Sequence, residues 1–311
     1  MDNRMKVVSV NNIKKTYKKV QALNGVSFEV DKGEIFGIIG PDGAGKTSLF
    51  RILTTLLLAD SGTAVVDGND VVKEYKQIRQ KVGYMPGRFS LYQDLTVEEN
   101  LKIFATLFGT TIEENYHLVE AIYSQIEPFK NRKAGALSGG MKQKLALSCT
   151  LIHEPVVLFL DEPTTGVDPV SRKELWDVLK ELKHQGVTIL VSTPYMDEAN
   201  LCDRIALIQD GSFMKIDTPQ QIIDDYDQIL WSVKSKEMFR LLNDLRENKN
   251  VLSCYAFGEV HHITIDPSAL ELKNPFSAAE LTSYLNDKNH EDVEISSINA
   301  SIEDCFMQLI A

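Results

Sequence analysis

The sequence predicts an α/β fold built on a strand, a glycine-rich loop and a helix, followed by a smaller α+β unit. An apolar run at 35–39 predicts a buried strand that leads through Gly40–Thr47 into a helix at 48–53. A second apolar run, at 156–160, ends in Asp161-Glu162 and predicts another buried strand. After about residue 221 the patterns follow the order βαββαβ, plus a final helix. These observations predict two units of different architecture.

Composition and charge limit the function classes. The 311 residues are enough for two domains, and 43% hydrophobic with 25% charged residues is ordinary for a globular protein. The net charge of −11 argues against a general nucleic-acid binder. Four scattered cysteines without a C-x-x-C pair disfavour disulfides and a zinc site and fit a reducing compartment. No apolar stretch approaches the ~18 residues of a membrane span, so we expect a cytosolic chain.

The segment before the glycine-rich loop is predicted to be a meander of strands. Strands are expected at 7–10 and 23–30, with a turn at 31–34 leading into the strand 35–39. Tyr17 falls in a polar loop between the first two strands, where it could stack on a base or pack on the sheet edge. Its position alone favours packing. Further strands are expected at 63–66 and 82–85.

Residues 89–154 are predicted to form a helical insert in the α/β domain. Thr96 and Glu99 fit a capping box, and apolar residues follow at helical spacing. The helical pattern continues over 112–129. After the insert we expect, in order, the strand 156–160, a helix at 170–185, a strand at 188–191 and an edge hairpin at 205–208 and 211–216.

The second unit carries no catalytic pattern. Strands are predicted at 229–233, 251–257, 260–265 and 293–295, and helices at 236–247, 277–286 and 302–310. This order is typical of a ferredoxin-like domain. His261 and His262 are neighbours in a predicted strand, so they should point to opposite faces, which argues against joint metal ligation.

The loop Gly40–Thr47 fits the phosphate-binding pattern G-x-x-x-x-G-K-[ST]. Glycines let the backbone aim its N–H groups at phosphate oxygens, and the helix N-terminus adds partial positive charge. We expect Lys46 to reach the β- and γ-phosphates and the Thr47 hydroxyl to bind Mg²⁺. The strand and helix on either side argue against a chance glycine-rich turn.

Two other segments complete the predicted chemistry. Asp161 ends a strand and should hold Mg²⁺ beside the loop, and Glu162 should deprotonate the water that attacks the γ-phosphate. The alternative, a solvated acidic turn, is the weaker interpretation beside a phosphate-binding loop. Ser138-Gly139-Gly140 precedes a predicted helix and forms a second anion-ready N-terminus; alone this motif is weak, but its place between the other two strengthens it.

With these motifs in order, residues 1 to about 220 resemble the ATPase subunit of an ATP-binding-cassette (ABC) transporter. The glycine loop matches Walker A, Leu137–Met141 the ABC signature, Leu158–Glu162 Walker B and Thr165–Asp168 the D-loop. Tyr17 matches the adenine-stacking aromatic, which reverses the preference drawn from its position. The segments LYQDLTVEENL, LSGGMKQKLALSCTLI and YMDEA are most similar to ATPases of ABC-2 type multidrug exporters of the YbhF-like group.

The resemblance implies an ABC ATPase domain over 1–220, with a RecA-like core, an antiparallel β subdomain and a helical subdomain, and an accessory ferredoxin-like domain over 221–311. It implies catalysis by Glu162 and Lys46 and Mg²⁺ binding by Thr47 and Asp161. It assigns the ATP contacts to Tyr17, Gly40, Pro41, Asp42, Gly43, Ala44, Gly45, Lys46, Thr47, Ser48, Ser138, Gly139, Gly140 and Asp168.

The partners implied are ATP, an ABC-2 type membrane permease and a second cassette, in a homodimer or a heterodimer, with no nucleic acid. Each ATP would lie between Walker A of one cassette and the signature of the other. The chain would sit in the cytoplasm on the inner face of the membrane, energising efflux of drugs or other small molecules or ions.

Two positions depart from the family pattern. Gly87 stands where a glutamine is expected after Tyr84-Met85-Pro86, and Pro194 stands where a histidine is expected after Ser192-Thr193. Either this branch of the family tolerates the loss of both polar side chains, or this subunit hydrolyses ATP slowly. The sequence favours neither alternative over the other. One competing function is a catalytically impaired subunit that completes a composite site with another cassette. Another is an ABC ATPase acting on DNA or ribosomes, which the acidic charge and the single cassette disfavour.

Overall fold

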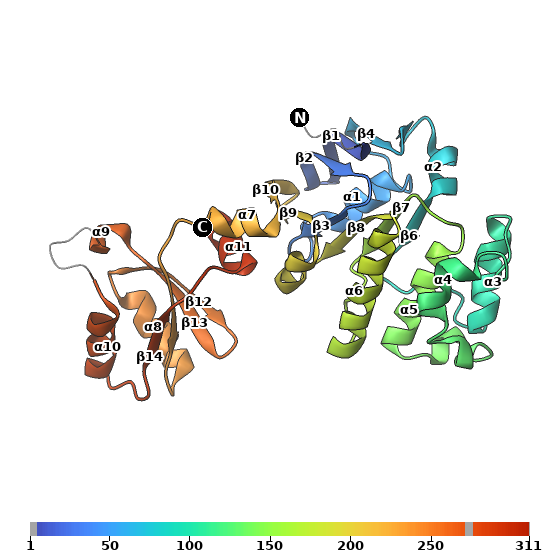
Figure 1. The fold of residues 1–311 in the computed structure, drawn as a ribbon. Coiled ribbons are helices and arrows are strands. Elements are labelled where there is room, and N and C mark those ends of the chain that lie inside the picture. Colours follow the sequence, from blue (N-terminus) through green and yellow to red (C-terminus); the bar gives the residue numbers. More distant parts are fainter. Residues whose placement is uncertain (1–4, 271–275, 311) are drawn as a thin grey trace. The chain divides into compact units, whose positions relative to one another are not determined.

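A computed structural model describes residues 5–270 and 276–310. The chain divides between Pro219 and Gln220 into two compact units. In the described residues, the first unit has two sheets and the second has one (Figure 1). No helix in these ranges is both long enough and apolar enough to cross a bilayer.

The first sheet is antiparallel, in the order β2-β1-β4-β5. Its strands are β1 (Lys6–Tyr17), β2 (Val20–Asp31), β4 (Ser61–Val66) and β5 (Asn69–Asp70). Two predictions were wrong here. Tyr17 is not in a loop but is the last residue of β1, paired with Val20. The strand after the turn at 31–34 does not continue the meander, because it belongs to a different sheet.

The second sheet has the order β10-β9-β3-β8-β7-β6, parallel except for the edge strand β10. Its strands are β3 (Ile35–Ile39), β6 (Val82–Met85), β7 (Val157–Asp161), β8 (Thr188–Thr193), β9 (Arg204–Gln209) and β10 (Ser212–Asp217). Every residue of β3, β7 and β8 is buried, as expected for parallel strands covered on both faces. The helices beside this sheet are α1 (Lys46–Leu53), α2 (Tyr75–Lys81) and α6 (Pro169–His184).

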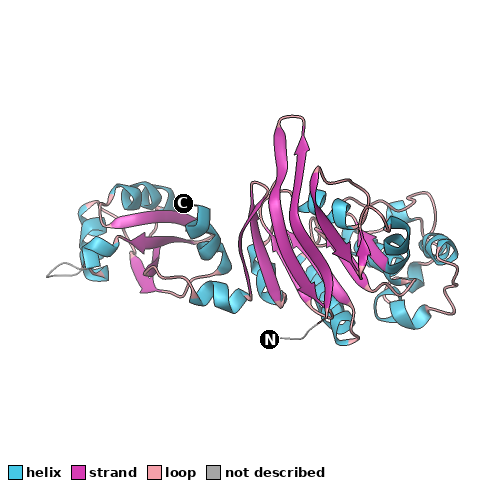
Figure 2. Cartoon of the chain, turned by 90° about the horizontal axis from the view of Figure 1, so that it is seen from above, coloured by secondary structure: helices cyan, strands magenta, loops and turns pink. Residues whose placement is uncertain are grey.

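The predicted helical insert contains α3 (Val97–Leu107), α4 (Tyr116–Tyr123) and α5 (Gly139–Leu151), which lie together at one end of the first unit (Figures 1 and 2). The capping box is confirmed, because the Thr96 side chain accepts from the Glu99 backbone and Glu99 bonds back to Thr96. The continuous helix predicted over 112–129 is wrong. Thr111 and Glu114 bond each other in a separate turn before α4, and Pro128, which has no N–H to donate, lies in a short 3-10 helix after it.

The second unit is an antiparallel sheet in the order β12-β13-β11-β14 with helices around it. Its elements are α7 (Pro219–Asp224), β11 (Leu230–Lys234), α8 (Met238–Glu247), β12 (Val251–Phe257), β13 (Val260–Ile265), α9 (Pro267–Leu270), α10 (Ala278–Asp287), β14 (Glu294–Ser297) and α11 (Ile302–Ile310). The predicted elements follow one another in the order βαββαβ with a final helix, and β12, β13 and α11 have the predicted bounds, but the short helix α9 between β13 and α10 was not predicted.

The core of the second unit lies on one face of its sheet. Leu241 and Leu245 of α8 and Leu281 and Leu285 of α10 pack with Ile263 of β13, all fully buried. His261 is on the same face, where its Nε2 contacts the Met238 carbonyl at 2.7 Å. His262 points to the other face and contacts Asp304 of α11 at 2.8 Å. The prediction that the two histidines face opposite ways is therefore confirmed.

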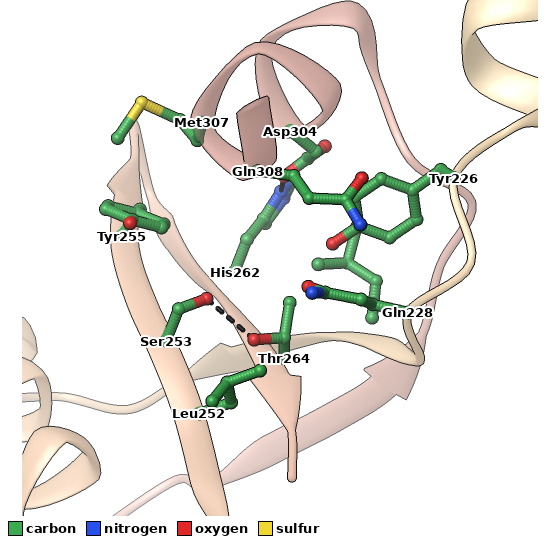
Figure 3. Close-up of a pocket in the computed structure, with 11 residues that line it drawn as sticks. Tyr226, Gln228, Leu252, Ser253, Tyr255, His262, Thr264, Asp304, Met307 and Gln308 are labelled. Atoms are coloured by element: carbon green, nitrogen blue, oxygen red, sulfur yellow. Dashed lines mark hydrogen bonds and ion pairs between the residues drawn. The ribbon is translucent and has the colours of Figure 1, made fainter. Parts of the chain in front are cut away.

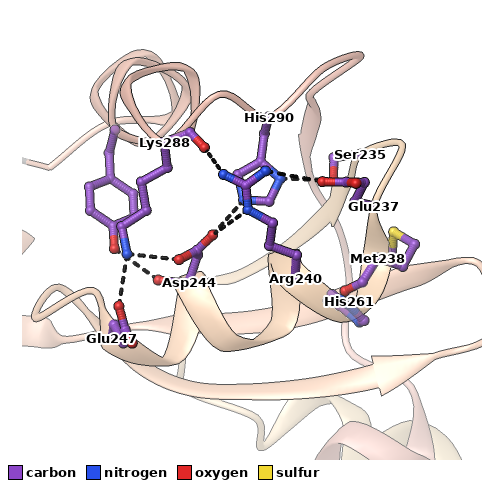
Figure 4. A network of polar contacts seen from close by, with 10 residues as sticks. Ser235, Glu237, Met238, Arg240, Asp244, Glu247, His261, Lys288 and His290 are labelled. Atoms are coloured by element: carbon purple, nitrogen blue, oxygen red, sulfur yellow. Dashed lines mark hydrogen bonds and ion pairs between the residues drawn. The ribbon is translucent and has the colours of Figure 1, made fainter.

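A polar network centred on Asp244 ties α8 to the residues that follow α10 (Figure 4). The Asp244 carboxylate accepts from Lys288 Nζ at 2.7 Å and contacts His290 Nε2 at 2.8 Å. Arg240 donates to the Lys288 carbonyl. The His290 side chain is fully buried. Burial opposes ionisation, but the hydrogen bonds from Lys288 and His290 outweigh it and hold the pKa of Asp244 below its usual value.

All four cysteines are buried and free of disulfides. Burial raises the pKa of the Cys149 and Cys202 thiols, and it raises the pKa of Cys254 to about 11.

We predict that Asp244→Asn destabilises the second unit at neutral pH by about 1–3 kcal/mol, because hydrogen bonds to a charged group are lost. The folded-state pKa lies below the unfolded value of about 3.9, so protonation favours the unfolded chain. The stabilisation is therefore complete above that value and is lost as the pH falls through the folded-state pKa. Urea unfolding at a series of pH values, followed by Trp231 fluorescence in a Trp176→Phe background, measures the free energy of unfolding of both proteins.

Asp287→Asn, at an exposed position on α10, is the matched control and should change stability little at any pH. A destabilisation by Asp244→Asn that stays constant down to pH 2 would contradict the linkage.

Candidate functional site

The loop between β3 and α1 depends on glycine at positions where no side chain fits. Gly45 has φ +105°, and a Cβ there would lie 2.2 Å from the Ala22 carbonyl oxygen. A Cβ on Gly40 would lie 2.2 Å from the Ile208 carbonyl oxygen. The loop therefore packs against its neighbours through bare backbone. No side chain caps the N-terminus of α1, so the first N–H groups of this helix remain open to a ligand.

Lys46 is an almost fully buried cation of the site. Its side chain is 3% exposed, and its Nζ donates to the carbonyls of Gly40 at 2.7 Å and Pro41 at 2.9 Å. The same Nζ lies 3.3 Å from Glu162 Oε1. The ammonium therefore bridges the loop at the end of β3 and the carboxylate that follows β7.

Asp161 and Glu162 are held differently although they are adjacent. Asp161 is buried at the end of β7, and its Oδ1 accepts from Ser192 Oγ at 2.7 Å. Glu162 has a left-handed backbone, φ +51°, and its N–H donates to the Ser192 carbonyl at 3.0 Å. A non-glycine residue in this region costs of order 1–3 kcal/mol, and such strain clusters at functional sites. The turn gives the two carboxylates separate surroundings.

Ser192 is a residue that the sequence analysis did not assign to the site. It lies in β8, fully buried, and contacts both Asp161 and the backbone of Glu162. A polar residue near the end of an otherwise apolar strand run is the signal in the sequence that points to it.

A cavity of about 210 Å³ is lined by four of the eight residues of the predicted loop, whereas Gly40, Pro41, Asp42 and Ala44 do not line it. Tyr17 reaches it from the end of β1, where its ring is 42% exposed and its hydroxyl accepts from Ser48 Oγ at 3.4 Å. Lys46 and Glu162 reach it from the other two sides. The full lining is Tyr17, Ala22, Gly43, Gly45, Lys46, Thr47, Ser48 and Glu162.

The signature segment and Asp168 do not line this cavity. Ser138 and Gly139 are exposed, and the Ser138 hydroxyl caps α5 by accepting from Met141 N at 3.3 Å. Gly140 is buried against the start of α6, since a Cβ there would lie 2.5 Å from Ser171 Oγ. Asp168 caps α6 and accepts from Ser171 N at 3.0 Å, and this hydrogen bond lowers its pKa. The predicted site residues thus form two groups.

Gly87 and Pro194 both lie beside the first group. A Cβ on Gly87 would lie 3.0 Å from the Asp161 carbonyl oxygen and 3.6 Å from Glu162 Cβ. Pro194 follows Thr193, whose carbonyl accepts from Gly40 N at 3.2 Å. The two positions without a polar side chain therefore neighbour the carboxylates and the first residue of the glycine loop.

The family profile described as ABC transporter matches residues 23–165. The probable multidrug ABC transporter ATP-binding protein YbhF of Escherichia coli is 43% identical over 220 residues, 70% of this chain and 38% of that protein. The chain thus spans well under half the length of this relative. The Nod factor export ATP-binding protein I of Burkholderia lata is 39% identical over 70% of this chain and 72% of that protein.

A solved structure with a similar fold is a dimeric ATP-binding cassette in a post-hydrolysis state, bound to ADP and Pi. It is 28% identical with a TM-score of 0.62, over 68% of this chain and 98% of that one. The cbiO1 subunit of Clostridium perfringens, part of the ABC transporter complex cbiONQ, is 26% identical with a TM-score of 0.63, over 71% and 91%. The fold of the first unit is therefore that of an ABC ATPase cassette, as the sequence predicted.

The glycine loop yields a stability prediction in matched variants. Gly43 and Gly45 both have positive φ, but a Cβ on Gly43 would meet nothing within 4 Å. Gly43→Ala should cost only the left-handed strain, about 1–2 kcal/mol. Gly45→Ala should cost a further ~1–3 kcal/mol because the new methyl overlaps the Ala22 carbonyl. Urea unfolding followed by Trp176 fluorescence, in a Trp231→Phe background, compares the stability of the two variants. Equal losses of unfolding free energy would contradict the close approach of Gly45 to the Ala22 carbonyl.

Proposed function

The chain belongs to the ABC transporter family as an ATP-binding protein, and from this we propose that it hydrolyses ATP to drive export through a separate membrane permease. The observation that carries the proposal is the meeting of the open N-terminus of α1, Lys46 and Glu162 in one cavity. The similarity to proteins named for multidrug and Nod factor export supports efflux of small molecules.

In this proposal the cavity binds ATP. The adenine ring stacks on Tyr17, whose exposed side chain lines the cavity. The backbone N–H groups of Gly40–Ser48 hold the phosphates, and Lys46 exchanges its carbonyl partners for the β- and γ-phosphates. The buried Lys46 ammonium is held by two carbonyls and one carboxylate, and the phosphates of the nucleotide can take the place of these partners.

The residues present fit a Mg²⁺ ion that arrives with the nucleotide. Thr47 presents a hydroxyl to the cavity, and the buried Asp161 carboxylate lies one residue before Glu162, which lines it. Both are the hard oxygen donors that this ion prefers. No cluster of three or more His, Cys, Asp or Glu side chains suited to a metal occurs among the described residues. That agrees with an ion held mainly by phosphates and water, which supplies charge neutralisation at the phosphates.

Glu162 is proposed as the general base. Its side chain is 22% exposed, and among the described residues Lys46 is its one ion-pair partner. Nucleotide binding that recruits Lys46 would therefore release Glu162 to accept a proton from water. The left-handed backbone turns this side chain toward the cavity, whereas Asp161 stays fixed by Ser192.

A second cassette is proposed to complete the site. Ser138, Gly139 and Asp168 are exposed and do not line the cavity of their own chain, so they are available to the γ-phosphate bound by a partner. The dimeric relative bound to ADP and Pi supports this arrangement.

The permease is proposed to be of the ABC-2 type and to contact the helical segment. Ile103 and Leu107 of α3 are 38% and 72% exposed and line an open apolar groove with Leu95. Exposed apolar patches of this kind mark protein interfaces. The chain would thus act in the cytoplasm, at the inner face of the membrane. Its net charge of −11 argues against a nucleic-acid partner.

Gly87 and Pro194 favour a second candidate function, an impaired subunit that completes a composite site with another cassette. Both lie beside the proposed catalytic groups, and neither side chain can position water or the γ-phosphate. We therefore propose ordinary ATP affinity with slow turnover for this chain alone.

The test of the proposed function is Glu162→Gln, which keeps the shape of the side chain but removes the base. Hydrolysis of Mg-ATP should fall about 10²–10⁴-fold, with ATP binding by calorimetry retained. If the second cassette is another copy, size-exclusion chromatography with Mg-ATP should show a dimer. Glu154→Gln is the matched control, because Glu154 is exposed and has a similar left-handed backbone, φ +55°. Unchanged hydrolysis in the Glu162 variant would refute its role.

Restoring the missing groups tests the second candidate. Gly87→Gln with Pro194→His should raise steady-state turnover at least ~10-fold without tightening ATP binding, since one positioned donor is worth ~10²–10³ in rate and such losses do not add. Gly87→Ala with Pro194→Ala is the matched control. It replaces the same glycine and proline without adding polar groups, so it should not raise the turnover rate. A wild-type rate of ~1–10 s⁻¹, in the usual enzyme range, would contradict the impaired site.

A further inference from the structure

The second unit contains a pocket on the face of its sheet opposite the core (Figure 3). The pocket has a volume of about 320 Å³ and lies between strands β12 and β13, helix α11 and the segment before β11. This volume is at the lower end of the ~300–1,000 Å³ of small-molecule sites. The pocket belongs entirely to the second unit and is separate from the cavity around Lys46.

The strand pattern explains why this face is lined by polar and aromatic side chains. Side chains alternate along a strand, so His262 and Thr264 of β13 face the pocket while Ile263 faces the core. On β12, Ser253 and Tyr255 face the pocket. The pairing of β12 with β13 shifts register between Val251 and Ser253, and Leu252 joins the lining beside Ser253.

Two side chains of the lining, Asp304 and His262, are fixed by each other and by two neighbours outside the lining, Ser301 and Phe257. Asp304 accepts from Ser301 N at 2.8 Å and from Ser301 Oγ at 2.6 Å through one oxygen, and its other oxygen contacts His262 Nδ1 at 2.8 Å. The imidazole also stacks on Phe257, with ring centroids 4.0 Å apart. An ionised carboxylate can only accept, so Nδ1 is the donor of this pair. In the tautomer with the proton on Nδ1, Nε2 is an acceptor, and the pairing and the stacking fix its direction.

Ser253 and Thr264 of the lining hydrogen-bond each other at 2.7 Å, but three other polar groups of the lining have no partner within the described chain. The Tyr226 hydroxyl, the Gln228 carboxamide and the Tyr255 hydroxyl make no hydrogen bond to the described residues. Burial, with the charge of Asp304 nearby, raises the pKa of Tyr226, so its hydroxyl stays a donor. Gln308 donates its Nε2 to Asp227 at 2.8 Å and keeps its carbonyl oxygen for the pocket. The pocket therefore offers converging donors and acceptors.

The charges and rings of the lining select the class of ligand. The lining contains no lysine or arginine, and Asp304 is its one charged group. A phosphate or carboxylate ligand would be buried without a cation, which is costly. Tyr226 and Tyr255 supply aromatic surfaces, and Leu252 and Met307 supply apolar ones. Such walls favour a flat ring over an extended polar molecule.

We propose that this pocket binds a small aromatic or heteroaromatic molecule, uncharged or singly cationic, whose N–H group donates to His262 Nε2. The molecule would lie against the tyrosine rings with its polar edge toward Gln228 and the His262–Asp304 pair. This assignment makes the second unit a ligand-binding domain. It does not depend on whether the first unit hydrolyses ATP.

Three probes that share a ring and differ in charge test the proposal: indole, tryptamine and indole-3-acetate. Saturation-transfer NMR on the full chain, without nucleotide, gives their relative affinities. Leu252→Trp fills the pocket from an exposed position, and Leu309→Trp, exposed on α11 outside the lining, is the matched control. Gln228→Ala removes a polar group without adding bulk.

We expect indole and tryptamine to bind at least about fivefold more tightly than indole-3-acetate. Leu252→Trp should weaken their binding at least about tenfold and Gln228→Ala about threefold, with Leu309→Trp unchanged and thermal unfolding preserved in all. Three results would overturn the proposal: no binding of any probe to the folded wild type, tighter binding of indole-3-acetate, or equal binding by the Leu252 and Leu309 variants.

Discussion

The parallel alignment of β3, β8 and β7 determines where the glycine loop and the two carboxylates of the candidate site lie. Ile39 pairs with Thr193, and Ser192 pairs with Asp161, so the three strands end at one edge of the sheet. The glycine loop, the carboxylates and the position of Pro194 all follow from that edge. Because side chains alternate along a strand, a slip of one residue would send Asp161 to the other face and remove its contact with Ser192. The chemistry of the site therefore rests on strand register.

The contact between Lys46 and Glu162 shows how the site is prepared before a ligand enters. A buried ammonium needs partners, and here two loop carbonyls and one carboxylate supply them. These partners hold Lys46 near the place where phosphate would lie, at the cost of keeping Glu162 occupied. The strained backbone of Glu162 and the fixed carboxylate of Asp161 separate two adjacent residues that would otherwise have similar surroundings.

The sequence was most informative where local chemistry determines the structure. The glycine loop, the Thr96–Glu99 capping box and the opposite facing of His261 and His262 follow from short-range rules, and the structure has them. Patterns that depend on distant partners were less reliable. The sheet to which β3 belongs is decided by pairing with β8 and β9, which spacing alone does not reveal. The pocket beneath α11 also arises from tertiary packing, and no local pattern indicates it. For Ser192, a polar residue in an apolar strand run marks the position, but its contacts with Asp161 and Glu162 depend on the pairing of β8 with β7.

The burial of all four thiols has a practical consequence for spectroscopy. With a pKa of about 11, a thiol such as Cys254 is ionised in only about one molecule in ten thousand at neutral pH, and only the thiolate reacts with alkylating dyes. Cys149 and Cys202 are shielded in the same way. A cysteine introduced on the surface would therefore take up a maleimide label selectively. Fluorescent or spin-label pairs can be attached to the two units without first removing any native cysteine.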